Sequence, residues 1–170
     1  MPHVETKNPQ LADQLAVETV RLFASEPPAE WDVPRFQRFW QYLTALGHEL
    51  PEPLRPLRPP IDLILGLREL PDDWDSYGSP PIDDRAVACG LVLLIQAEQE
   101  NAPAPQVCPV PGGGVQLEWQ NGPRALELEA LPDGSAQFLR VDGDTMDEGP
   151  VELHGLPQVR TLLQWLFAKR

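Results

Sequence analysis

The stretch GVQLEWQNGPRALELEA, residues 114 to 130, decides the fold because apolar and polar residues alternate on both sides of a turn signal. A period of two is typical of strands with one buried face and one face in water. Asn-Gly is the strongest short hairpin signal, and it needs positive φ at both positions in a two-residue turn. Asn121-Gly122 therefore predicts a turn that pairs strands 114–120 and 124–130 in antiparallel fashion.

Downstream of this hairpin, further turn and strand signals extend the sheet. Pro132-Asp133-Gly134 predicts a turn into a strand over 136–141. A loop, DGDTMDEG (142–149), then leads to a short strand near 151–153. Apolar residues at helical spacing predict a last helix over 156–168. The pattern indicates an antiparallel β-meander of three to five strands with a C-terminal covering helix.

Upstream of the sheet, the apolar residues recur at helical spacing. Residues 81–99 form the most apolar of these segments and predict the central helix, with Ser79 as N-cap and Pro80 and Pro81 in its opening positions. Two amphipathic helices are predicted before residue 50. The fold class is therefore α+β, with N-terminal helices, one central apolar helix, an antiparallel β-meander and a C-terminal covering helix.

The same pattern predicts how the chain is organised. Residues 1–50 form an N-terminal helical pair, residues 51–60 a proline-rich connector, and residues 61–170 the α+β core domain. The connector reads PEPLRPLRPP, and its five prolines predict an extended, semi-rigid segment close to polyproline II.

Composition excludes several classes of function. The 170 residues carry 26 acidic and 13 basic side chains, a net charge of -13. Nucleic acid and anionic membranes need a positive surface, so neither is an expected ligand, whereas a basic protein partner fits this charge. No signal peptide is expected, and the longest apolar run is far shorter than the roughly 20 residues of a membrane span. The chain is predicted to be cytoplasmic, with Cys89 and Cys108 as free thiols.

The acidic loop LPDDWDSYGSPP, residues 70–81, concentrates three carboxylates and two aromatic side chains. Loops held on a scaffold are common sites of function, and exposed aromatics anchor interfaces. The partner-binding residues predicted here are Asp73, Trp74, Asp75 and Tyr77.

Two alternatives for this loop stay open. In the first, Asp73 or Asp75 caps local backbone and Trp74 packs as a lid on the core. In the second, an EF-hand-like pattern that starts at Asp73 binds calcium. That pattern has Pro81 at its ninth position and Asp84 where glutamate is the rule, so no metal is expected.

Other motifs give little support to catalysis. Gly112-Gly113-Gly114 lacks the Lys-Ser/Thr of a phosphate loop and leads into a strand, so it predicts a hairpin or bulge turn. GxSxG, HExxH and CxxC motifs do not occur. The acidic residues Asp142, Asp144, Asp147 and Glu148 are interpreted as a solvated turn. No catalytic residue and no cofactor are expected.

A resemblance spans roughly residues 70 to 130. The loop WDSYGSPP, the following helix, a PxVxP strand and GGGVQLEW resemble small bacterial proteins of unassigned function that carry a WDs-G-P loop and a GG-x-LEW strand. The resemblance implies no particular activity, cofactor or site residue.

These observations favour a non-enzymatic, acidic protein-interaction module of the bacterial cytoplasm. One alternative is an antitoxin- or immunity-type inhibitor that covers a basic, nucleic-acid-acting protein with its negative charge. The other is a small metal-assisted hydrolase built on the acidic loops. The sequence leaves the oligomeric state and the identity of the partner open.

Overall fold

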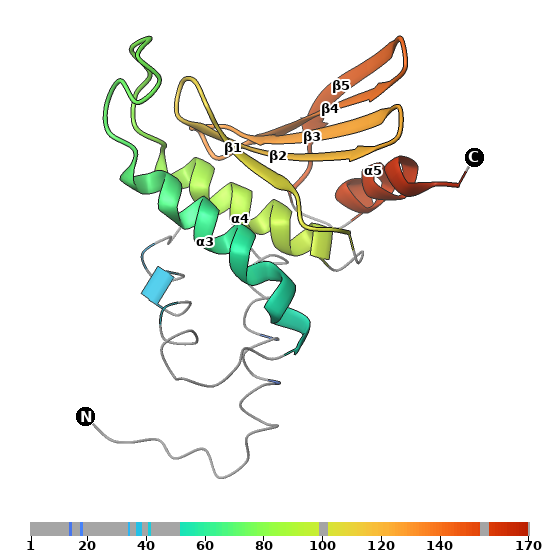
Figure 1. The fold of residues 1–170 in the computed structure, drawn as a ribbon, viewed down its shortest axis with the longest axis horizontal. Coiled ribbons are helices and arrows are strands. Elements are labelled where there is room, and N and C mark those ends of the chain that lie inside the picture. The colour runs from blue at the N-terminus through green and yellow to red at the C-terminus, as the bar shows by residue number, and fades with distance from the viewer. Residues whose placement is uncertain are drawn as a thin grey trace.

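The computed structural model describes residues 52–98, 102–153 and 157–169, with isolated positions between 14 and 41. The N-terminal helical pair predicted for 1–50 otherwise lies outside the described residues. The described part is α+β, as predicted (Figure 1). Its elements are η1 (Glu52–Leu57), α3 (Arg58–Gly66), η2 (Leu67–Glu69), α4 (Asp84–Glu98), β1 (Gln106–Val110), β2 (Gly114–Asn121), β3 (Arg124–Ala130), β4 (Ala136–Asp142), β5 (Thr145–Val151) and α5 (Pro157–Phe167).

The five strands form one antiparallel meander in the order β1-β2-β3-β4-β5. The register pairs Leu117 with Leu128, and Leu128 in turn with Phe138, so one face carries the apolar side chains. That inner face turns toward α4 and α5, which lie below the sheet in Figure 1. The alternation that predicted an antiparallel sheet with one buried face is confirmed.

The turn between β2 and β3 lies one residue later than predicted. Asn121 pairs with Arg124, so the two central residues are Gly122 and Pro123. Gly122 has φ +61, whereas the proline ring fixes φ near -65°, so only the first central position is left-handed. Glycine at the first central position is the requirement of a type II′ turn, and the predicted pair of positive φ angles is wrong.

A second correction concerns residues 142–149, which were predicted to be a loop. Asp142 pairs with Thr145 across a tight turn, and β5 runs from Thr145 to Val151. Gly143 supplies the positive φ, +61, that the turn needs. Thr145 Oγ1 also donates a hydrogen bond to the Asp142 carbonyl at 2.8 Å.

The proline-rich segment is not extended. Residues 52–57 form the 3-10 helix η1, and α3 begins at Arg58. Prolines are tolerated in the first turn of a helix, where the missing N–H has no partner to lose. Leu54 and Leu57 are buried in the core cluster, which gives this segment a reason to fold onto the rest.

Helix α4 lies at the centre of the core. Every residue from Ala86 to Ala97 is buried, and the helix contacts α3, α5, β2 and β3. A Cβ at Gly90 would lie 3.1 Å from Val115 Cγ1, so this glycine sets how closely α4 approaches the sheet. The predicted central apolar helix is present, although it begins at Asp84 and not at residue 81.

Side chains of the β2–β3 hairpin contact the end of α5. Asn121 Nδ2 donates to the Leu166 carbonyl at 2.9 Å, and Arg124 donates to the carbonyls of Trp165 and Ala168 at 2.8 and 3.2 Å. The last carbonyls of a helix have no intrahelical partner, so these donors satisfy groups that would otherwise be orphaned. The helices among the described residues are all too short or too polar to span a membrane.

Candidate functional site

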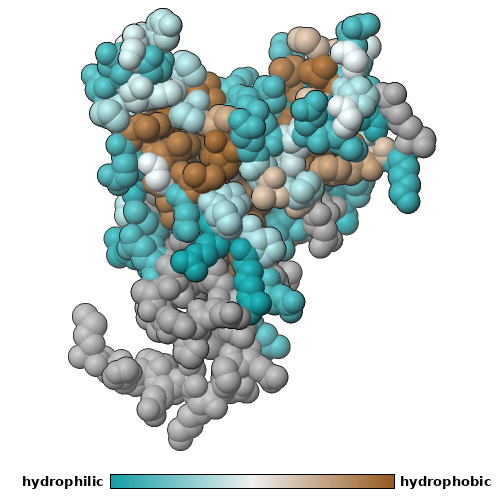
Figure 2. Space-filling view, viewed as in Figure 1, coloured by the Kyte–Doolittle hydropathy of each residue, from teal (hydrophilic) through white to brown (hydrophobic). Residues whose placement is uncertain are grey.

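The acidic loop is held in shape by its own polar groups. Asp73 Oδ1 accepts a hydrogen bond from the Gly78 N–H at 2.7 Å. Asp75 accepts from the backbone N–H groups of Tyr77 and Ser79 at 2.9 and 3.2 Å and from the Ser79 hydroxyl at 2.6 Å. These bonds hold the loop in one conformation. Figure 2 shows the loop as a mainly hydrophilic projection at the upper left of the molecule.

The backbone of this loop is strained. Asp73 and Ser76 have φ angles of 60° and 63°, and they are the only non-glycine residues with positive φ in the described part of the chain. Such conformations cost about 1–3 kcal/mol each and persist only where the surrounding contacts impose them. The hydrogen bonds to Asp73 and Asp75 are contacts of that kind.

The two aromatic side chains of the loop have different environments. The Trp74 indole is half-buried against the core and donates from Nε1 to the Pro80 carbonyl at 3.2 Å. Tyr77 is 93% exposed. Of the two aromatic side chains, Tyr77 is therefore the one that the loop presents to solvent.

The predicted N-cap of α4 is wrong. The Ser79 hydroxyl bonds Asp75, and the cap is Asp83, whose Oδ1 accepts from the Arg85 N–H at 2.8 Å. A residue that precedes proline is disfavoured in the helical region. Ser79 precedes Pro80, and Pro80 precedes Pro81, so neither residue favours a helical conformation. The helix can therefore start only beyond the two prolines.

The acidic loop rests on the glycine turn between β1 and β2. The Asp83 N–H donates to the Gly113 carbonyl at 3.0 Å. Gly113 has φ +96, and a Cβ there would lie 3.0 Å from the Pro81 carbonyl oxygen and 3.7 Å from Pro132 Cγ. The glycine turn is thus a hairpin turn, as predicted, and it also lets the loop approach the sheet closely.

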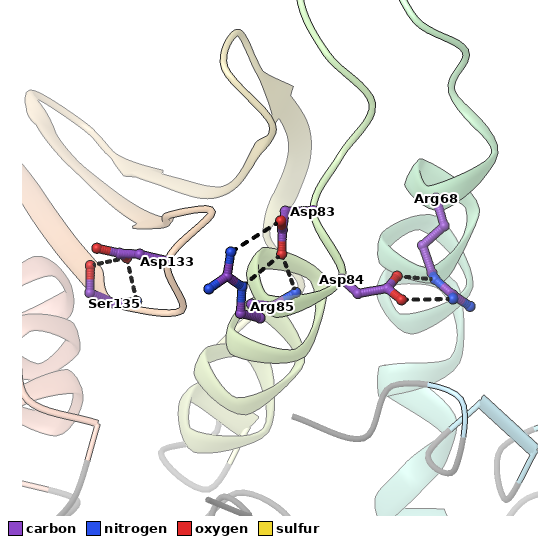
Figure 3. Close-up of polar contacts among 6 residues, drawn as sticks. All are labelled: Arg68, Asp83, Asp84, Arg85, Asp133 and Ser135. Atoms are coloured by element: carbon purple, nitrogen blue, oxygen red, sulfur yellow. Dashed lines mark hydrogen bonds and ion pairs between the residues drawn. The ribbon is translucent and has the colours of Figure 1, made fainter. Parts of the chain in front are cut away.

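Ion pairs close the base of the loop (Figure 3). Arg68 of η2 pairs with Asp84 at 2.6 Å, and Arg85 pairs with Asp83, two residues earlier, at 3.2 Å. Figure 3 shows Arg85 pointing toward the turn that carries Asp133. The hydrogen bond and charge of Asp83 raise the pKa of Arg85, and Asp133 adds to that shift. The basic groups drawn here are paired with carboxylates of this chain.

The calcium alternative finds no support in the geometry of the loop. Hydrogen bonds from the Ser79 hydroxyl, and then from the Tyr77 and Ser79 backbone, lower the pKa of Asp75, so this carboxylate is charged but its oxygens already accept N–H and O–H donors. Among the described residues, no group of three or more His, Cys, Asp or Glu side chains is placed to hold a metal ion.

The second acidic segment, 142–149, lies at the opposite end of the sheet from the acidic loop in Figure 1. Within it, Asp142 pairs with Arg124 at 3.0 Å and Asp147 with Arg140 at 2.6 Å. Carboxylates of the acidic loop and of segment 142–149 therefore lie far apart. Acid–base chemistry shared between them would need them close together.

Neither cysteine is an activated nucleophile. Both are free thiols, as predicted. Burial raises the pKa of Cys89 to about 12, and Asp133 adds to the shift. Burial also raises the pKa of Cys108. Nucleophilic cysteines need a lowered pKa, so both thiols stay protonated at neutral pH.

A second acidic surface, which the motifs did not indicate, is the face of the sheet that turns away from α4. We call it the outer face. Its side chains are Gln106 and Cys108 of β1, Gln116, Glu118 and Gln120 of β2, Ala125, Glu127 and Glu129 of β3, Gln137, Leu139 and Val141 of β4, and Met146, Glu148 and Pro150 of β5.

On the outer face, glutamine amides link the glutamates. Gln116 Nε2 donates to Glu118 and to Glu127 at 2.9 and 3.0 Å, and Gln137 Nε2 donates to Glu129 at 2.9 Å. Burial raises the pKa of Glu127 above its ordinary value of 4.5, and the charges of Glu118 and Glu129 raise it further against the hydrogen bond from Gln116. A cavity of about 610 Å³ lies over this face, lined in part by Glu127, Glu129 and Glu148.

The strand period already placed these glutamates on one face, because Glu118, Glu127 and Glu129 all fall at polar positions of the alternation. What the sequence did not show is the cavity that Glu127 and Glu129 line together with Glu148 of β5. No family model, no curated protein and no solved structure matches this chain. Its function must therefore be argued from the geometry of these two surfaces.

Proposed function

We propose that this chain is a cytoplasmic protein-interaction module that works by binding, and that the acidic loop is its partner-binding site. The observation that carries the proposal is Tyr77, a large aromatic side chain that is 93% exposed on a loop fixed by internal hydrogen bonds. In this proposal Tyr77 makes the main contact, while Asp73, Trp74 and Asp75 hold its position and form the rim.

Physical chemistry favours such a loop as a binding element. Ordering side chains and loops at an interface costs free energy, and a loop that is already ordered avoids most of that cost. Tyrosine is enriched among the residues that carry most of the binding energy, because it buries a large area with few rotatable bonds. Strained backbone positions such as Asp73 and Ser76 are also found more often at functional sites than elsewhere.

The proposed kinship with bacterial proteins that carry a WDs-G-P loop and a GG-x-LEW strand fits this view. The two motifs touch where Asp83 bonds Gly113 and where Pro81 lies against the same glycine. They form one structural unit, in which the glycine turn of the second motif supports the loop of the first.

A cross-linking experiment tests the proposal. A photo-reactive phenylalanine analogue replaces Tyr77 in one variant and Leu63, a residue of α3 that is 56% exposed, in a matched variant. Cells that express each variant are irradiated, and the adducts are identified by mass spectrometry. We expect a defined protein adduct from position 77 that position 63 does not give. Equal adducts from both positions, or none from position 77, would refute the proposal.

A second candidate is an antitoxin- or immunity-type inhibitor of a basic, nucleic-acid-acting protein. The specific observation that favours it is the outer face, on which three glutamates cluster beside a large cavity. If a nuclease or toxin gene neighbours the gene for this chain, the purified protein is expected to suppress the activity of that neighbour in stoichiometric amounts. Full activity in the presence of excess protein would eliminate this candidate.

A further inference from the structure

The outer face carries several negative charges and no basic side chain of its own strands. Four glutamates project from it, Glu118 from β2, Glu127 and Glu129 from β3, and Glu148 from β5. The five strands, all of which are described, place no lysine or arginine on this face. None of the four glutamates takes part in an ion pair within the described chain. Among the described residues, their negative charge therefore has no basic partner in an ion pair.

The arginines of the sheet lie on the other face. Arg124 and Arg140 point to the inner side, where they pair with Asp142 and Asp147. Both guanidinium groups also lie over the Trp165 ring, at 5.5 and 5.3 Å from its centre. These two arginine side chains are therefore held between the sheet and α5, where they cannot neutralise the outer glutamates.

The neutral partners of the outer glutamates compensate only part of their charge. Gln116 bridges Glu118 and Glu127, which lie directly opposite each other on β2 and β3. Like charges directly opposite on neighbouring strands are destabilising. The fold thus maintains a repulsive arrangement beside a cavity of about 610 Å³, which Glu127 helps to line. A cation from outside would relieve that repulsion.

The spacing of the charges decides what kind of cation fits. From β2 to β5 is three strand spacings, or about 14 Å, which equals about four residues of extended chain. A single divalent ion binds its ligands at roughly 2–2.6 Å, so it cannot serve carboxylates spread over this span. A polypeptide with several basic side chains can. Apolar Leu139, Val141 and Met146 border the glutamates and offer contact to the stems of such side chains.

The two edges of the sheet are poorly suited to pairing with a strand of another protein. Pro109 lies in β1 and Pro150 in β5, the two edge strands, and proline has no N–H to pair with an added strand. A partner that approaches the sheet is therefore directed to the outer face and away from strand addition at an edge.

We infer that the outer face is a docking site for a basic segment of another protein, whose lysine or arginine side chains pair with Glu118, Glu127, Glu129 and Glu148. This inference rests on the proposal that the chain acts by binding a protein, and it names the chemistry of the partner. It uses a surface other than the acidic loop, so the two sites stand or fall separately.

The test uses the full chain and a fluorescent oligo-arginine peptide as the probe, with affinity measured by anisotropy at low salt. The test variant carries Glu127→Gln and Glu129→Gln, which keep an acceptor for the bonds from Gln116 and Gln137. The matched control carries Glu52→Gln and Glu69→Gln, two exposed residues of η1 and η2 that remove the same charge.

We expect the test variant to bind the peptide about tenfold more weakly than the wild type, because two pairs at a half-buried face are lost. The control variant is expected to lose less than about twofold, since exposed charges act on the peptide only through a screened field. Amide shifts on titration are expected to map to β2 through β5. Melting curves of all three proteins establish that the substitutions leave the fold intact.

Several results would overturn the inference. Equal losses in both double variants would mean that only the overall charge of the chain attracts the peptide. Amide shifts elsewhere would place the site on another surface. Spermine or calcium that binds the outer face as tightly as the peptide would make the occupant a small cation. A failed cross-link at residue 77 with this peptide result intact would refute the proposed loop site alone.

Discussion

Glu127→Gln is expected to stabilise the protein at neutral pH, which is unusual for a change at a half-buried, hydrogen-bonded residue. Glu127 lies directly opposite Glu118 on β2, and Glu129 follows two residues later on the same face. A directly opposed like-charge pair costs some tenths of a kcal/mol, and the second neighbour adds a similar amount. The glutamine keeps an oxygen to accept the bond from Gln116. The expected gain is about 0.5–1 kcal/mol, or about 1–4 °C in melting temperature for a domain of this size.

The pH dependence fixes the sign of this prediction. Because the folded pKa of Glu127 is raised above 4.5, the protonated carboxyl is favoured in the fold. The stability that protonation gives is fully present below 4.5 and is lost as pH rises through the folded pKa. The advantage of Glu127→Gln should therefore appear at neutral pH and vanish in acid, below that ordinary value.

Thermal melts at neutral and acidic pH measure both effects. Glu148→Gln is the matched control, because Glu148 lies on the same face but opposite Leu139. A melting temperature that falls in Glu127→Gln, or that rises no more than in Glu148→Gln, would refute the charge argument. So would a gain that persists in acid.

Three further predictions concern the turns and the acidic loop. Gly113→Ala should lower the melting temperature more than Gly112→Ala. The two φ angles are nearly equal, +96 and +95, but only at Gly113 would the Cβ meet a backbone oxygen at 3.0 Å. Equal losses in the two variants would mean that this close approach does not matter. Gly122→Val should cost about 1–3 kcal/mol in chemical denaturation, because φ is +61 although the space is open, and unchanged stability would count against the turn. Ser79→Ala should move the pKa of Asp75 back toward 3.8 in a carbon NMR titration, since the Ser79 hydroxyl is the largest cause of its lowering, and an unmoved titration would contradict that assignment.

The sheet could be predicted from sequence because a period of two is a local signal. The pairing of 114–120 with 124–130 follows from alternation alone and holds even though the turn lies one residue later. Asn-Gly alone does not place the turn. With Asn121 and Gly122 at its centre, Pro123 would have to donate the N–H that closes the turn onto Gln120, and proline has none. The missing N–H of Pro123 therefore outweighs the preference of Asn-Gly for the centre of the turn.

The proline-rich segment was misjudged for a related reason. Prolines exclude a helix interior but not a first turn, and which of the two applies depends on what the segment packs against. Leu54 and Leu57 are buried, and that tertiary burial is not visible in PEPLRPLRPP. The residues of the acidic loop were identified from their composition. The structure was needed to show that the side chains of three of them make hydrogen bonds within the loop, whereas Tyr77 is 93% exposed.

The central claim is that Tyr77 anchors a protein partner on a loop that is formed in advance. The most direct measurement is the affinity, by isothermal titration calorimetry, of the partner cross-linked at residue 77 for the wild type, Tyr77→Ala and the control Leu63→Ala. We predict that Tyr77→Ala weakens binding by at least ~1 kcal/mol, about fivefold or more, with an unchanged melting temperature and no effect of Leu63→Ala. An affinity for Tyr77→Ala equal to that of the wild type would contradict the claim.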